Sequence, residues 1–207
     1  MRYVLLISAL LLGVSIGASG LTGCASTRPA ATKTVRSLDA LTATLESGRG
    51  QLYDLAATLT EPLEHGGVDA KWFKRFANAR ADVADLDADL ADELDAFRER
   101  RSEYTERWEL DLARINDAEL RKLARERRAR LKVRLDAIGD DLAEAAEQLQ
   151  PLRKQVDDLH IVLGNDLTRE ALAGVEGRLG DAAEASARIG DRLDDLAGDT
   201  AALAGDL

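Results

Sequence analysis

The sequence predicts an all-α fold, an elongated antiparallel bundle or coiled coil of three to four long helices. Two observations predict it. Only 4% of the 207 residues are aromatic, whereas Ala, Leu, Asp, Glu and Arg are abundant, a composition typical of long amphipathic helices. Apolar residues also recur in alternating steps of three and four along most of the chain, which keeps them on one helix face.

Residues 1–23 are predicted to be a lipoprotein signal peptide. Arg2 supplies a short positive region, and residues 4–16 form an apolar run shorter than a comfortable membrane-spanning helix. The sequence Leu-Thr-Gly-Cys at residues 21–24 resembles the lipobox of bacterial lipoproteins, which implies cleavage before Cys24 and attachment of a diacylglyceryl group to its sulfur. An ordinary secretory signal with an incidental Cys is the alternative.

Cys24 is the only Cys in the chain, and it lies at the one position where this lipid chemistry needs it. Ala25 follows it, rather than Asp, which in Gram-negative lipoproteins resembles the pattern exported to the outer membrane. We therefore expect a periplasm-facing protein anchored in the outer membrane by its acyl chains. Residues 24–34 are small, polar and include Pro29, so they are expected to form a flexible tether.

The bundle itself is expected to cover residues 35–207, with helices at about residues 35–60, 69–115, 117–163 and 168–205. In the first helix a seam of leucines is broken only by Gly48, and Pro62 with Gly66 and Gly67 is expected to end it. In the third helix the seam has no break, and Pro151 is expected to kink the helix without ending it. The fourth helix is rich in Gly, each costing about 1 kcal/mol relative to Ala.

The second and third helices are expected to form a long hairpin that turns near residue 116. Asn116, followed three residues later by Glu119, has the spacing of a capping box and is expected to cap the third helix. The second helix is predicted to exceed the first by nearly 20 residues, or about 28 Å, so the hairpin should reach back toward the lipid anchor. Arg101 and Arg127 interrupt the apolar stripes, so closure of the seam by self-association stays open as an alternative.

Basic charge gathers at the end of this hairpin. Residues 98–134, called the basic tip below, hold thirteen basic and eight acidic residues, although the whole chain carries a net charge of −10. The candidate contacts for an anionic surface, either anionic lipid or peptidoglycan, are Arg121, Lys122, Arg125, Arg128 and Lys132. The alternative is a solvated face that keeps the rod soluble.

Other function classes find little support in the residues. The negative net charge argues against nucleic-acid binding, because phosphates would be repelled over most of the surface. One Cys and two distant histidines, His65 and His160, leave no zinc ligand set, and no phosphate-binding Gly loop occurs. We therefore expect no enzyme, no catalytic residues, no metal site and no cofactor.

Several short segments also carry a family resemblance. They are WELDL at residues 108–112, LRK at residues 120–122, Pro151, QVDDLHIVLGNDL at residues 155–167 and the Ala-Leu pair at residues 171–172. Together, from about Leu41 onward, they resemble a family of bacterial envelope proteins called domain of unknown function 2959. The resemblance implies a lipoprotein or secreted coiled-coil protein without an established activity.

The function expected from these patterns is that of a non-enzymatic, lipid-anchored periplasmic tether, spacer or scaffold of the cell envelope. The alternative is a membrane-anchored adaptor or chaperone-like module whose helical groove binds a protein partner. An exposed apolar seam would favour the alternative.

Overall fold

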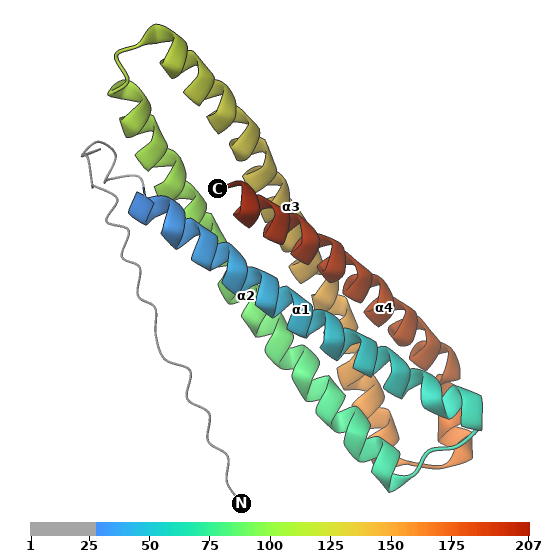
Figure 1. Cartoon of the computed structure of the whole chain (residues 1–207). Helices are drawn as coiled ribbons and strands as arrows, with labels where there is room; N and C mark the ends of the chain where they lie inside the picture. Colours follow the sequence, from blue (N-terminus) through green and yellow to red (C-terminus); the bar gives the residue numbers. More distant parts are fainter. Residues whose placement is uncertain (1–27) are drawn as a thin grey trace, which may run out of the picture.

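The computed structural model describes residues 28–207, which form four long helices joined by short loops (Figure 1). The helices are α1 (Arg28–His65), α2 (Ala70–Ala113), α3 (Ala118–Asn165) and α4 (Arg169–Asp206), and this part of the chain contains no strand. Each helix packs against two neighbours, α1 and α3 each lying between α2 and α4. The prediction of an all-α antiparallel bundle is therefore confirmed, with four helices.

One continuous apolar core runs along the bundle, and it is built from the predicted seams. All ten predicted seam residues of α3 are buried: Leu131, Leu135, Ile138, Leu142, Ala145, Leu149, Leu152, Val156, Leu159 and Leu163. The leucine seam of α1 is also fully buried, and Gly48 lies within it. Because the apolar face of each helix is covered by two others, burial of these side chains is the main force that stabilises the rod.

Gly48 lies where α1 packs closely against α2 and α4. A Cβ atom at this position would lie 2.5 Å from Leu86 Cδ1 and 3.1 Å from Leu193 Cδ1, so a larger residue would require these leucine side chains to shift. Beside this contact, Arg49 forms an ion pair with Asp194, and the Tyr53 hydroxyl donates to Asp191 at 2.6 Å. These polar contacts border the α1–α4 interface on its solvent side.

Side chains at the loops cap three of the helices. Asp69 accepts a hydrogen bond from the Trp72 amide at 2.6 Å, and Thr168 accepts one from the Ala171 amide at 3.2 Å. The third cap differs from the prediction, because Asp117 rather than Asn116 accepts from the Leu120 amide, at 2.8 Å. Asn and Asp are about equally good capping residues, and the negative charge of Asp117 is also favoured beside the positive end of the helix dipole. The cap lies one residue later than expected.

The helix ends also differ from the prediction at α1. Residues 28–34, expected to belong to a flexible tether, form the first turns of α1. Pro29 does not prevent this, because the first turn of a helix has no use for the N–H that proline lacks. At the other end Pro62 lies inside the helix, which continues to His65 and stops before Gly66, whose φ is +66°.

Pro151 likewise lies within an uninterrupted α3, in agreement with the expectation that it does not end the helix. The other helix ends fall within two residues of those predicted. The predicted excess of nearly 20 residues in the second helix is wrong, because α2 has 44 residues and α1 has 38, a difference of six.

The two ends of the rod are different. The loops at residues 66–69 and 166–168 close one end, whereas the start of α1, the end of α4 and the α2–α3 turn all point toward the other (Figure 1). The α2–α3 hairpin extends beyond both α1 and α4 at that end (Figure 1). None of the described helices has the length and apolar character needed to cross a bilayer.

Candidate functional site

The outer part of the basic tip is a two-helix projection, because α1 and α4 end before α2 and α3 reach their turn (Figure 1). The last turn of α4 reaches α3 at Arg127, which donates to the Asp206 carbonyl at 2.6 Å, and at Arg134, which pairs with the Asp206 carboxylate. Thr44 of α1 donates to Glu93 of α2 at 3.3 Å. Counting back along α1 from this contact places its first residue level with about residue 109 of α2.

The turn of the tip is held by a side chain from α3. Arg121 donates from Nε and Nη2 to the Ile115 carbonyl at 2.8 and 2.5 Å, so it occupies a backbone acceptor left free where α2 ends. Arg114 donates its amide to the Asp111 carbonyl at 3.1 Å, which ends α2 in a tighter turn. Arg121 is therefore a structural residue of the turn as well as a basic one.

The five predicted surface contacts divide into two groups. Arg128 pairs with Glu109 of α2, and Lys132 donates at 2.5 Å to Asp136, which also pairs with Arg101. These two therefore have acidic partners within the protein, and Arg121 is engaged as described. Lys122 and Arg125 are exposed and have no ion pair within residues 28–207. Arg130, not among the predicted contacts, is also exposed and unpaired in that range.

Exposed leucines accompany these free cations, and sequence reasoning missed them. Leu120 and Leu123 of α3 each expose 59% of their surface, and Leu110 of α2 exposes 63%. At Leu120 the exposure arises because α1 and α4 have both ended, although Ile161, which is 61% exposed, shows that apolar side chains are exposed elsewhere on α3 as well. A signal was available in the sequence, because Leu120 lies eleven residues before Leu131 and so lies near the same face of α3 as the seam.

Two aromatic side chains lie on α2 just below this uncovered region. Tyr104 and Trp108 meet edge to face, with ring centroids 5.4 Å apart, and both pack against the end of the core. Burial raises the pKa of Tyr104 to about 12, an effect opposed by the nearby Arg127 guanidinium. Both rings therefore extend the core at this end, although each is only partly covered.

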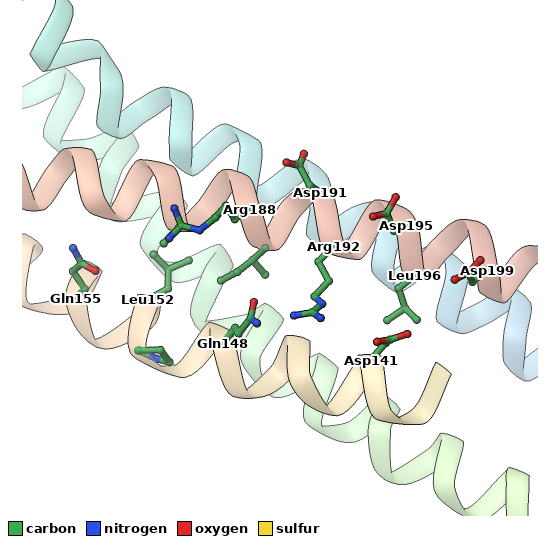
Figure 2. A pocket seen from close by; sticks show the side chains of 13 residues that line it. Asp141, Gln148, Leu152, Gln155, Arg188, Asp191, Arg192, Asp195, Leu196 and Asp199 are labelled. Carbon is green, nitrogen blue, oxygen red and sulfur yellow. The ribbon is translucent and has the colours of Figure 1, made fainter. Parts of the chain in front are cut away.

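A second concave surface lies between α3 and α4, remote from the turn (Figure 2). It encloses about 860 Å³ and is bordered by polar side chains that include Gln148, Gln155, Arg188 and Asp195. The apolar side chains that line it are buried and not available to a partner, because Leu152 and Leu196 are each only 2% exposed. Arg192 of α4 crosses the groove to donate to Glu144 of α3 at 2.5 Å, so the two walls are tied together.

The histidines lie apart from both surfaces. His65 is exposed at the end of α1, and His160 of α3 stacks on Phe73 of α2 with ring centroids 4.9 Å apart. Burial lowers the pKa of His160; the nearby Arg80 guanidinium acts in the same direction and Asp157 opposes it. Within residues 28–207, no three His, Cys, Asp or Glu side chains are grouped so that they could hold a metal ion.

Cys24 and the predicted signal peptide lie outside the described residues, so lipid attachment remains a prediction. No protein-family model, curated protein or solved structure matches the chain, and the family resemblance therefore remains a prediction too. What the described residues define is a four-helix rod with one projecting, basic, partly apolar end.

Proposed function

We propose that the chain is a non-enzymatic scaffold or spacer of the bacterial envelope, anchored by lipid on Cys24 and facing the periplasm from the outer membrane. The lipobox-like sequence at residues 21–24 and the single Cys support the anchor. The bundle supports the mechanical role, since 48 residues of uninterrupted α3 span about 72 Å.

The observation that carries the proposal is the direction of the chain. The start of α1 points toward the same end of the rod as the basic tip (Figure 1). Three residues lie between Cys24 and Arg28, so the four steps from one to the other span at most about 14 Å. Since α1 starts level with about residue 109 of α2, the turn at residues 114–117 lies about 10 Å beyond that start. A membrane that holds Cys24 is therefore within reach of the basic tip.

In this arrangement the anchor and the basic tip make two contacts with one surface or with neighbouring envelope surfaces. The anchor alone leaves the rod free to swivel. A second contact through free cations such as Lys122 and Arg125 would orient it, because each basic residue near an anionic surface contributes about 1 kcal/mol. The opposite end of the rod would then face away from the membrane, at a fixed height.

The lipid anchor is tested by expression of the full chain and its Cys24→Ser variant in a Gram-negative host fed with labelled palmitate. The wild type should incorporate label and fractionate with outer membranes, whereas the variant should do neither. An unlabelled wild-type chain would contradict the proposal, whatever the basic tip binds.

The second candidate function, an adaptor for a protein partner, is favoured by the groove between α3 and α4 (Figure 2). The buried apolar lining of that groove favours the scaffold instead, because a module awaiting a partner is expected to expose its seam. Binding of an apolar dye distinguishes the two. A scaffold should bind little dye and stay monodisperse over a wide concentration range.

A further inference from the structure

A small hollow in the basic tip gathers three arginines. It encloses about 360 Å³ between the end of α2 and the start of α3 and is lined by Glu109, Leu112, Ala113, Arg121, Arg125 and Arg128. The arginines follow one another at spacings of four and three along α3, which places their side chains on one face of that helix. Leu112 is 8% exposed and contributes an apolar wall.

The charges lining this hollow are not balanced. Glu109 accepts from Arg128, and Arg121 is held by the uncharged Ile115 carbonyl. Arg125 has no partner within residues 28–207, and the Nε of Arg128 is buried without a hydrogen-bond acceptor. Three guanidinium groups thus face one carboxylate, with donor groups still unused, so the hollow favours an anion with several acceptor oxygens.

We propose that this hollow binds the phosphate of an anionic phospholipid, while Leu120 and Leu123 insert at the boundary between headgroups and acyl chains. The proposal rests on the function proposed above and specifies the surface that the basic tip meets. Leu120 lies five residues nearer the turn than Arg125, about 7.5 Å along α3. A tip that meets the bilayer end-on therefore places Leu120 and Leu123 deeper than Arg125 and Arg128, whereas Arg121, held at the turn, lies at the level of the leucines.

The exposed leucines favour lipid over peptidoglycan. Both surfaces are anionic and would attract Lys122 and Arg125, but only a bilayer offers an apolar phase for side chains that are 59% exposed in the protein. Self-association of two basic tips is disfavoured for a different reason. Each tip carries a net charge of +5 and would repel the other.

Vesicle sedimentation of residues 25–207 without the lipid tests the proposal. Every described core residue lies within this segment, so it keeps the whole bundle. The chain should bind vesicles of equal parts phosphatidylglycerol and phosphatidylcholine, less strongly as salt increases, and should not bind phosphatidylcholine alone. Arg125→Glu should weaken the affinity roughly 30-fold, from two lost units of charge near the surface. Leu120→Ser with Leu123→Ser should weaken it roughly tenfold.

Matched controls lie farther along the same helix. Lys154→Glu makes the same charge change at an exposed site on α3, and Ile161→Ser removes an apolar side chain that is 61% exposed. Both should bind within about twofold of the parent. Circular dichroism of each variant should show unchanged helix content, because all five substituted positions are exposed.

Several results would overturn the proposal. One is the absence of binding to the anionic vesicles; another is leucine variants that bind as well as the parent chain. If inorganic phosphate displaces the chain more strongly than chloride at equal ionic strength while the leucine variants bind normally, the hollow binds free phosphate instead. Pelleting with sacculi but not with vesicles would identify peptidoglycan as the partner. None of these results depends on palmitate labelling. Failure of the proposed lipid anchor can therefore be distinguished from failure of the proposed phospholipid site.

Discussion

The indole Nε1 of Trp72 donates a hydrogen bond of 2.8 Å to the backbone carbonyl of Thr58. In a regular helix that carbonyl would accept from the amide of residue 62, but residue 62 is proline and has no N–H. The side chain from α2 thus replaces the missing bond of α1. This contact explains how Pro62 lies inside a helix instead of ending it.

A double-mutant cycle at these positions tests that explanation. Trp72→Phe should lower the free energy of unfolding by about 2 kcal/mol, because a buried ring shrinks and a carbonyl loses its partner. In a Pro62→Ala background the new amide can serve the Thr58 carbonyl, so the same change should cost about 1 kcal/mol less. Urea unfolding followed by circular dichroism measures both. Equal costs in the two backgrounds would mean that the hydrogen bond contributes nothing.

The glycines of α1 and α4 should respond in opposite ways to alanine. Gly48→Ala forces a methyl group against Leu86 and Leu193, and this overpacking should outweigh the better helix propensity, with a net loss of about 1 kcal/mol. Gly177 of α4 is exposed, with nothing within 4 Å of an added Cβ, so Gly177→Ala should raise the free energy of unfolding by up to about 1 kcal/mol. Stabilisation by Gly48→Ala would show that the core adjusts there at little cost.

These glycines illustrate what the sequence could predict. The step pattern of three and four identified nearly every buried position, because burial on a long helix depends mainly on which face a residue occupies. It also marked Gly48 as a member of the seam, but not the reason for its small size, which depends on Leu86 and Leu193 from two other helices. The axial register of one helix against another is set by packing between helices, so the spacing of residues within one helix does not predict it.

The basic tip shows the same division. The sequence located the cluster of positive charge, yet it gave no means of separating Arg128, which pairs with Glu109 across the hairpin, from the unpaired Arg125. Spacing alone placed Leu120 near the seam face of α3, but its exposure depends on where α1 and α4 end, which local spacing does not determine. Likewise Asn116 and Asp117 are both good capping residues, and their choice depends on how the turn closes.

Stability should depend on pH through His160. Its pKa is lowered in the folded protein by burial beside Phe73, so below the ordinary value of 6.5 the unfolded chain binds more protons than the folded one. The free energy of unfolding should therefore fall as the pH decreases from 6.5 through the lower folded value, and the contribution should be complete above 6.5. The measurement is the free energy of unfolding in urea, determined for the wild type and for His160→Gln between about pH 8 and pH 5. An equal decline in both proteins would exclude this role.

Charge reversal within the basic tip should not act uniformly. Lys132 already donates to Asp136, so Lys132→Glu should weaken binding to anionic vesicles less than Arg125→Glu does, although the change in net charge is the same. The expected ratio of affinities is roughly three to tenfold. Vesicle sedimentation at low salt provides it. Equal effects would mean that binding to the vesicles depends only on the total charge of the chain and that the arginine hollow does not form a specific binding site.

The central claim is that the anchor and the basic tip face one membrane, and depth quenching of a fluorophore tests it most directly. The lipidated chain is reconstituted in anionic vesicles that contain brominated lipid, with bimane attached at Leu123→Cys or, as the control, at Ile161→Cys. In the proposed lipoprotein, acylation would consume the thiol of Cys24, the chain's single Cys, so each variant would carry one reactive site. We predict strong quenching at position 123 and none at position 161. Equal fluorescence at the two positions, or stronger quenching at position 161, would contradict the account.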